Sequence, residues 1–496
     1  MDGSLLSLLI FTPAAAAVVL LLLVPRDAER VHRWVSLLAS LAALGLALVA
    51  WSRFDPADPS FQLVESRTWL PQIGIGYRLG MDGIALVLVL LTVLLQPLVF
   101  ISSWSSITSK VKGYVVSMLL LETGVLGAFL ATDLFLFYVF WELMLVPMYF
   151  IIGVWGGERR IYAAVKFVLF TLAGSLLMLV GILYLGFLAH AQTGAWTFAF
   201  EDMRRLAIPM GEGFWHSPQL LLFAAFALAF SVKVPVFPLH TWLPDAHVEA
   251  PTGGSVILAG ILLKLGTFGL LRFNRTLFPE AWDKATPLFL TLAVIAIIYG
   301  ALVSWAQKDM KKLVAYSSVS HMGFIILGLF AGTVASTQGA LLQMVNHGLS
   351  TGALFLLVGV VYERRHTRMI ADYGGIAGIV PAYTGIFLLV TLSSIGLPGL
   401  NGFIGEFLIL AGSWRVFPAA VVFAGLGIII GAVYMLWMFQ RVFWNPLSHD
   451  ENRTLTDLNL REVLALAPLV VLIVWIGVHP TTFLSPMEAA VRSLLG

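Results

Sequence analysis

The sequence predicts an all-α polytopic membrane protein, with about fourteen transmembrane helices and two inverted five-helix repeats that each contain a broken helix. The chain has 496 residues, of which 59% are hydrophobic and only 11% are charged. Its mean hydropathy of +0.93 excludes a soluble globular protein. The apolar residues form runs of spanning length, separated by charged or Pro/Gly-rich breaks. Ionisable side chains lie inside several of these runs, and such residues indicate a functional site.

Composition also excludes several classes of function. The net charge of +2 is too small to indicate a nucleic-acid partner. The chain has no cysteine, which excludes disulfides, cysteine-bound iron–sulfur clusters and thiol nucleophiles. The first apolar run, 5–24, lacks a basic segment before it and a clear cleavage site after it, so we expect a retained first span.

The apolar runs place the helices in order along the chain. The connection 190–218 is expected to be an amphipathic surface loop. The segment 74–80 resembles a nucleotide loop only faintly, because its glycine spacing is wrong and it leads into a membrane helix. The predicted spans are 4–24, 33–51, 82–104, 113–131, 133–155, 161–189, 219–246, 251–272, 285–306, 311–331, 336–362, 377–412, 417–444 and 462–484, of which 219–246 and 377–412 contain an interruption.

The distribution of arginine and lysine predicts the orientation. Odd-numbered connections carry sixteen of these residues, whereas even-numbered connections and the C-terminal tail carry ten. Cytoplasmic loops hold the excess of positive charge, so both termini are expected on the outer side.

The interruption in 219–246 follows a lysine at membrane depth. Inserting Lys233 at this depth costs a free energy of about 2.5–3.5 kcal/mol, so a lysine there indicates a specific role. Pro235 and Pro238 lack an N–H, so we expect the carbonyls of Ser231 and Val234 to lose their helical partners. A broken helix with a cation at the break is typical of transporter ion sites. The alternative is a proline kink with a lysine that reaches the surface. The polar residues continue with His240, Asp245 and His247.

A second interruption, in 377–412, precedes Glu406. Pro398 is expected to free the Ser394 carbonyl, and four glycines loosen the neighbouring turns. Each of the two five-helix repeats ends with a broken helix followed by a straight one. Because five is an odd number, the second repeat enters the membrane from the opposite face, so the two repeats are inverted. The predicted parts are 1–110 (three helices), 111–275 (first repeat), 284–445 (second repeat) and 446–496 (C-terminal loop and last helix).

Eight ionisable side chains inside the apolar runs suggest a proton relay. Burial and pairing shift the pKa values of such groups into a useful range, and histidine titrates near neutral pH. Glu142 lies before Pro147, which is expected to free the Leu143 carbonyl. The eight are Glu122, Glu142, Lys166, Lys233, Lys264, His321, His347 and Glu406.

Plainer interpretations exist for some of these residues. Glu122 and Lys166 lie nearer helix starts, where a structural ion pair would explain them equally well. His321 has the alternative of a hydrogen bond between helices. His347 is followed by Gly348, which leaves room for water and favours a functional role. A haem held by two histidines is disfavoured, because no second histidine pair lies at a matching depth.

At these residues the chain resembles the antiporter-like subunits of respiratory complex I over nearly its whole length. The M-type of these subunits, also called chain 4, carries glutamate where the other two paralogues usually carry lysine, and this sequence has Glu406 there. The sequence also leaves no room for the long lateral helix of the L-type. The matching stretches are 141–142, 233–251, 262–266, 308–323 and 346–348.

The resemblance implies a proton-pumping subunit of a bacterial NADH:quinone oxidoreductase, with no redox centre in this chain. Glu142 would pair with Lys233, and Lys264 would link the two halves. His321 and His347 would carry the proton to Glu406, which would release it outward. FMN, iron–sulfur clusters and quinone would belong to partner subunits. The implied partners are other membrane-arm subunits, including two paralogous antiporter-like subunits, in the bacterial inner membrane.

Two rival functions share part of this pattern. A subunit of a multisubunit sodium/proton antiporter would have the same fold and lysines, although Glu406 and the length favour complex I. A purely structural membrane scaffold would share the broken helices, but the buried charges argue against it.

Overall fold

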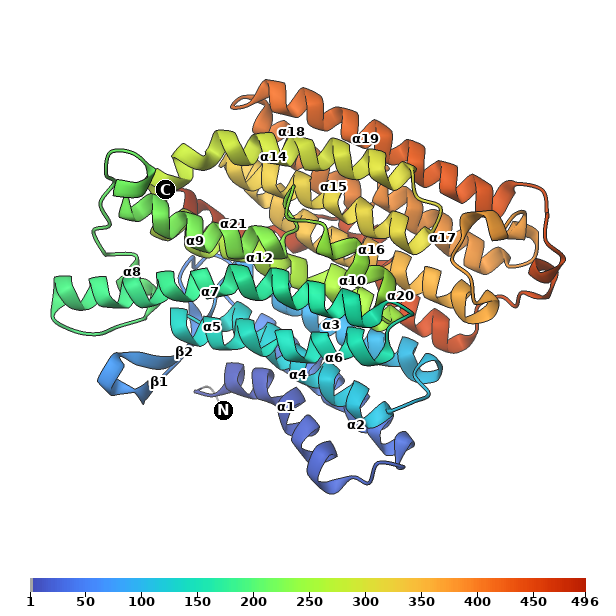
Figure 1. Cartoon of the computed structure of the whole chain (residues 1–496), viewed down its shortest axis with the longest axis horizontal. Helices are drawn as coiled ribbons and strands as arrows, with labels where there is room; N and C mark the ends of the chain where they lie inside the picture. The colour runs from blue at the N-terminus through green and yellow to red at the C-terminus, as the bar shows by residue number, and fades with distance from the viewer. Residues whose placement is uncertain (1–2) are drawn as a thin grey trace.

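Long helices lie side by side through most of the molecule, as Figure 1 shows for the computed structural model, which describes residues 3–496. Within the described residues, 12 helical segments are long and apolar enough to cross a membrane. The predicted spans 219–246 and 377–412 are each divided into two shorter helices. The all-α membrane fold is therefore confirmed, while the exact total of fourteen spans stays a prediction.

The first half of the chain begins with four long helices and one divided helix. A two-stranded hairpin separates α2 from α3. The bounds are α1 Leu5–Leu23, α2 Glu29–Ser52, β1 Gln62–Leu70, β2 Ile75–Met81, α3 Gly83–Ser106, α4 Val111–Leu130, α5 Leu134–Leu143, α6 Leu145–Trp155, α7 Arg160–Thr193, α8 Phe200–Met203, α9 Pro218–Lys233 and α10 Trp242–Glu249.

The second half begins with a helix that widens twice into π-helical turns. These turns are Leu258–Leu262 and Leu270–Asn274. The remaining helices are α11 Thr252–Ile257, α12 Leu263–Gly269, α13 Arg275–Leu277, α14 Pro279–Trp305, α15 Met310–Ala331, α16 Val334–Arg365, α17 Pro381–Ser394, α18 Asn401–Trp414, α19 Pro418–Phe439, α20 Leu460–Val478 and α21 Thr481–Leu495.

The helices that carry the buried charges lie at the centre of the bundle. Every residue is buried in the most apolar stretch of Thr252–Leu277. In the corresponding stretches of α15 and α16, 94% of the residues are buried. By contrast, only 28% are buried in the corresponding stretch of Pro418–Trp444, whose helix α19 runs along the top of Figure 1, and 39% are buried in that of α7. The central helices therefore shield their polar residues from lipid, and the outer helices provide the apolar surface.

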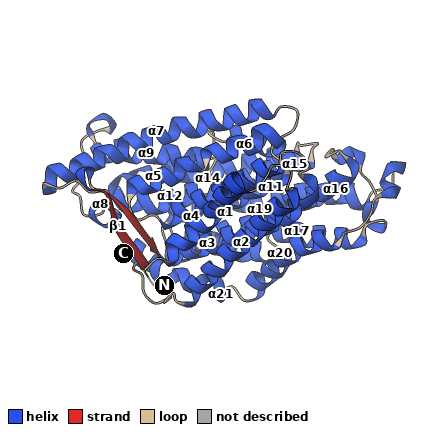
Figure 2. Ribbon diagram, turned by 90° about the horizontal axis from the view of Figure 1, so that it is seen from below, coloured by secondary structure: helices blue, strands red, loops and turns tan. Residues whose placement is uncertain are grey.

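The hairpin is an element that the sequence did not predict. Strands β1 and β2 are antiparallel and join through Gly74 at φ +72°. A Cβ on Gly74 would lie 2.1 Å from the Trp196 carbonyl oxygen, so this position requires glycine. The buried Glu65 carboxylate accepts a hydrogen bond from the Leu6 N–H at 2.7 Å. This bond fixes the hairpin to α1, and Figure 2 shows the two strands lying together near one end of the helix bundle.

Two other sequence expectations need correction. The helix around Lys264 is not straight, because the two π-helical turns each insert one residue into the α-helical pattern. The connection 190–218 is not simply a surface loop, since α7 continues to Thr193 and Phe198 and Phe200 are buried. Aromatic side chains thus anchor a segment whose polar residues suggested exposure.

Candidate functional site

The first broken helix has the expected interruption but a different hydrogen-bond pattern. α9 ends at Lys233, and α10 begins at Trp242. The Ser231 carbonyl is not free as expected, because it accepts a hydrogen bond from the Val236 N–H at 2.9 Å. The Val232 carbonyl accepts a second one from the Trp242 indole N–H, also at 2.9 Å. The chain itself therefore satisfies two of the carbonyls that surround Lys233.

The α5–α6 junction agrees with the position of Pro147. α5 ends at Leu143, and α6 begins at Leu145. The next backbone bond, from the Met148 N–H to the Met144 carbonyl, is long at 3.3 Å. The break thus lies at Met144 and places the Glu142 carboxylate in the last turn of α5.

Lys233 is enclosed mainly by aromatic rings. Lys233 is only 1% exposed. Its Nζ lies 5.0 Å from the Trp141 ring centroid and 5.7 Å from the Phe167 ring centroid. No ion pair of 4.0 Å or less joins Lys233 to an acid within the described residues, although Glu142 is near enough to act on it electrostatically. Cation–π contacts therefore stabilise this ammonium in place of a tightly bound carboxylate.

Lys264 lies fully buried between the two π-helical turns. Its Nζ donates a hydrogen bond to the Ala259 carbonyl at 2.5 Å and lies 2.5 Å from His347 Nδ1. π-helical turns often occur at functional sites, because they displace the backbone and change which carbonyls accept hydrogen bonds. The wide turn that contains Ala259 thus gives the lysine an oxygen ligand and leaves it in contact with an imidazole.

Two histidines connect Lys264 to Glu406. The rings of His347 and His321 lie 5.6 Å apart, and His321 Nδ1 lies 3.2 Å from Glu406 Oε1. Gln343 donates a further hydrogen bond to the same oxygen at 3.2 Å. We name Lys264, His347, His321 and Glu406 the central path. All four residues are at most 8% exposed.

Four further candidates lie around this path. Lys166 forms an ion pair with Asp245 at 2.7 Å, which agrees with the structural interpretation of Lys166. Glu122 has no such partner, because neither of its buried carboxylate oxygens accepts a hydrogen bond within the described residues. His240 packs between the rings of Phe237 and Tyr299, and the fully buried His247 stacks on Phe355 at 4.8 Å.

Sequence reasoning missed two buried cations, which lie at the ends of the predicted spans 251–272 and 311–331. Arg272 pairs with Asp82 at 2.7 Å, and its guanidinium lies over the rings of Phe61 and Phe268. Lys311 is only 6% exposed although it follows a short connection. Helix ends are the least reliable feature of a sequence prediction, so burial at these two positions had no clear signal.

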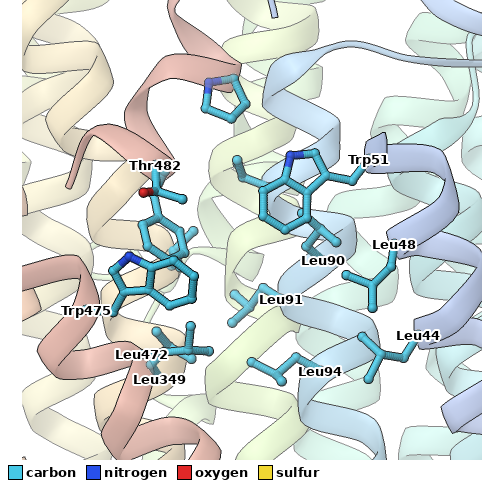
Figure 3. A pocket seen from close by; sticks show the side chains of 14 residues that line it. Leu44, Leu48, Trp51, Leu90, Leu91, Leu94, Leu349, Leu472, Trp475 and Thr482 are labelled. Carbon is cyan, nitrogen blue, oxygen red and sulfur yellow. The ribbon is translucent and has the colours of Figure 1, made fainter. Parts of the chain in front are cut away.

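An apolar pocket has none of these groups in its lining. It has a volume of about 190 Å³ and is lined by leucines, tryptophans and other apolar side chains from α2, α3, α16, α20 and α21 (Figure 3). Among the residues that the structure describes, Thr482 is its one polar lining residue and no ionisable side chain lines it. Within residues 3–496, no group of three or more histidine, cysteine, aspartate and glutamate side chains is arranged to hold a metal ion.

Comparison with known proteins identifies close relatives. The family described as NADH:quinone oxidoreductase/Mrp antiporter, TM, matches residues 131–431. NADH-quinone oxidoreductase subunit M of Rhodobacter capsulatus is 45% identical over 484 residues, covering 96% of this chain and 94% of that protein. A chain of respiratory complex I from Thermus thermophilus with bound NADH is 34% identical with a TM-score of 0.88, covering 99% of this chain and 100% of that chain. A chain of the Mrp complex from Dietzia sp. DQ12-45-1b is 25% identical with a TM-score of 0.81, covering 98% of this chain and 52% of that one.

Proposed function

The chain belongs to the NADH:quinone oxidoreductase/Mrp antiporter family, and we propose that it is the M-type membrane subunit of an NADH:quinone oxidoreductase that translocates protons. The reduction of quinone, driven by NADH oxidation in other subunits, would supply the energy. This chain would contribute only the proton path through its buried glutamate, lysine and histidine residues.

The central path is the observation that carries this proposal. Its consecutive groups are a lysine, two imidazoles and a carboxylate, all shielded from solvent by surrounding helices. Each of these side chains binds and releases protons, and none has a redox role without a cofactor. Their sequence of contacts allows a proton to pass from Lys264 to Glu406 across three helix interfaces.

Individual roles follow from position along the path. Glu142 modulates the charge of Lys233 in the first half, and Lys264 receives the proton in the second half. His347 and His321 carry it to Glu406, which releases it toward the outer face. Glu122, His240 and His247 are secondary carriers, and Lys166 is held by Asp245 at the edge of the first half.

The partners and location follow from the same family. We propose that the chain lies in the bacterial inner membrane with both termini on the outer side. It would contact other membrane-arm subunits, including the two paralogous antiporter-like subunits. FMN, iron–sulfur clusters and quinone would be held by partner subunits.

The test measures proton pumping per NADH oxidised in sealed vesicles that contain the complete complex. Lys264→Met is expected to reduce pumping strongly while the complex still assembles, because methionine has a similar shape and no proton. Lys284→Met is the matched control, since Lys284 lies exposed on α14. Normal pumping by the Lys264 variant would contradict the proposal.

The likeness to the Mrp complex chain supports a second candidate, a subunit of a sodium/proton antiporter. The two candidates differ in what they assemble with. Purification of the chain with an NADH-oxidising peripheral arm supports the first, whereas sodium-dependent proton exchange without such an arm supports the second.

A further inference from the structure

Three buried amide side chains join Glu406 to the break between α17 and α18. Gln343 and Asn346 lie on α16, and Asn401 is the first residue of α18. Each of the three is at most 2% exposed, so its amide finds hydrogen-bond partners inside the protein. A side-chain amide donates and accepts hydrogen bonds but does not ionise. These residues are therefore not proton carriers, and what they hold in place is the question.

The direction of the hydrogen bonds is set by the Asn401 backbone carbonyl. This oxygen only accepts, so the Asn346 atom that contacts it at 2.7 Å is the amide nitrogen Nδ2. The same nitrogen donates to Gln343 Oε1 at 3.2 Å. Because the oxygen end of Gln343 is occupied in this way, its nitrogen end faces Glu406, and Nε2 donates to Oε1 of the carboxylate at 3.2 Å. A carbonyl at the helix break thus determines which end of Gln343 contacts Glu406.

The opposite orientation of either amide is disfavoured. A reversed Asn346 would place its oxygen against the Asn401 carbonyl oxygen, and a reversed Gln343 would place its nitrogen against the Asn346 nitrogen. The close approach depends on Gly405, since a Cβ there would lie 2.3 Å from Gln343 Oε1 and 2.8 Å from Asn346 Nδ2. Glycine at this position therefore lets α18 pack against the two amides of α16.

The Asn401 side chain forms a separate set of bonds. Its Nδ2 donates to the Ser350 hydroxyl at 3.2 Å and to the Asn346 carbonyl at 3.4 Å. Its Oδ1 accepts a hydrogen bond from the Ser393 hydroxyl at 2.5 Å. Ser350 lies on α16 and Ser393 on α17, so this side chain ties three helices together at the break. It is a tether, whereas the backbone carbonyl of the same residue orients the amides.

We propose that Asn346 is a positioning residue that acts through Gln343 to present an N–H donor, rather than a carbonyl, to Glu406. This proposal rests on the proton-translocating function above. An N–H bonds the carboxylate and the protonated acid alike, whereas a carbonyl bonds the protonated acid only. With the donor in place, Glu406 keeps the same neighbour before and after it releases a proton. Neither amide gains or loses a proton in the process.

The titratable groups that surround Glu406 come from three other helices. His321 on α15 contacts Oε1 at 3.2 Å, and the His347 ring on α16 lies 5.6 Å from the His321 ring. Tyr434 on α19 is buried near enough to Glu406 to be affected by its charge. α17 has no charged side chain, and α20 has charged side chains only in its first turn. None of these groups changes when the Asn346 amide is removed.

The experiment measures proton pumping per NADH oxidised as a function of pH, in sealed vesicles that contain the complete complex. Asn346→Leu removes the amide that orients Gln343 and fills a similar space. We expect pumping near neutral pH to fall several-fold and the pH optimum of pumping to move upward by about one unit, the size of one hydrogen bond. The direction follows because a Gln343 carbonyl bonds only the protonated acid, so that proton release then needs a higher pH.

Asn274→Leu is the matched control. Asn274 is also fully buried, and its Nδ2 donates to a backbone carbonyl of another helix, that of Phe223 at 2.9 Å. Like Asn346, it has an Oδ1 without a hydrogen-bond partner within the described residues. The control therefore removes a comparable buried amide elsewhere, and we expect it to keep the wild-type pH optimum. An equal shift of the optimum in both variants would overturn the positioning role.

Two further variants separate orientation from tethering. If Asn346 acts through Gln343, adding Asn346→Leu to Gln343→Leu causes no further loss of pumping, whereas additive losses would overturn the proposal. Asn401→Ala removes the bonds to the two serines but keeps the backbone carbonyl. We expect it to lower the thermal unfolding temperature of the purified complex while the pH optimum is kept. A shifted optimum in Asn401→Ala would show that any disturbance of the break suffices, which would also overturn the proposal.

The remaining outcomes separate this proposal from the proposed function. If Asn346→Leu does not assemble, Asn346→Ser makes the same test, because serine lacks the amide and occupies less space. Normal pumping with an unchanged optimum in the Asn346 variant, while Lys264→Met is inactive, would reject the positioning role and leave the proposed function intact. If Lys264→Met also pumps normally, the proposed function itself fails.

Discussion

The two broken helices place opposite charges on opposite sides of the break. In both, one backbone bond spans an extra residue, from Val236 to Ser231 at 2.9 Å and from Leu397 to Leu392 at 3.0 Å. Lys233 is the last residue of the helix before its break, whereas Glu406 lies in the second turn of the helix after its break. Helix C-termini favour cations and N-termini favour anions, so the sign of each charge matches the nearer helix end.

The surroundings of the two charges differ as well. Lys233 faces aromatic rings and has no close anion within the described residues, whereas Glu406 receives polar contacts from His321 and Gln343. The face of an indole stabilises an ammonium without forming an ion pair. The Glu406 carboxylate is instead oriented by direct hydrogen-bond contacts. The comparison therefore predicts that aromatic packing matters at the first break and that hydrogen bonding matters at the second.

The largest expected effect is at Glu406. Glu406→Gln keeps the size and hydrogen bonding but does not ionise, so pumping should fall to the level of passive leak with little loss of assembly. Glu406→Asp should keep part of the activity. Glu406→Lys tests the sign, and we expect it to pump no better than glutamine because His321 and Gln343 donate toward this position. A glutamine variant that pumps normally in a less stable complex would show a purely structural role.

The second largest effect on pumping is expected when the pair of Glu142 and Lys233 is disrupted. Either residue changed to alanine should reduce pumping several-fold while the complex still assembles, as measured in sealed vesicles and by native gel electrophoresis. The double variant should be no worse than the worse single variant if the two act as a unit. Additive losses would show that they act independently.

A smaller effect is expected when the aromatic surroundings of Lys233 are changed. Trp141→Leu removes the ring 5.0 Å from Nζ, and a desolvated contact of this kind stabilises by about 2 kcal/mol. Pumping should fall a few-fold, with Trp215→Leu as the control because Trp215 is 78% exposed. Equal pumping by the two variants would show that the aromatic ring beside Lys233 does not contribute to pumping.

The smallest effect on pumping is expected from Trp242→Phe. This change removes the indole N–H that bonds the Val232 carbonyl, and an unsatisfied buried acceptor costs about 1–3 kcal/mol. Thermal unfolding of the purified complex should shift downward while pumping is largely kept. A loss of pumping without a shift would mean that this bond belongs to the proton path rather than to the fold.

The sequence predicted the helices and the central path because each depends on a local pattern. Apolar runs locate spans, and a charge within a run must be buried in protein. Lys264, His321, His347 and Glu406 were found in this way, although only the structure shows them in contact. Their individual roles stay a prediction.

Other features could not be predicted because they depend on contacts between distant segments. The Ser231 carbonyl accepts a hydrogen bond from the Val236 N–H because the backbone makes a wider turn there, which the positions of the two prolines alone do not imply. The π-helical turns around Lys264 have no composition signal. The burial of Lys311 and Arg272 depends on neighbouring helices that cover the bundle ends.

The central path has a consequence for membrane voltage. Lys264, His347 and His321 each lie near the middle of a long helix, so the path runs along the membrane plane rather than across it. A charge that crosses the bilayer exchanges about 2.3 kcal/mol with each 100 mV of potential, but a charge that moves in the plane exchanges almost none. Transfer from Lys264 to His321 should therefore proceed equally well in a resting and an energised cell. The opposing voltage acts only on the steps that bring a proton into the path and take it out.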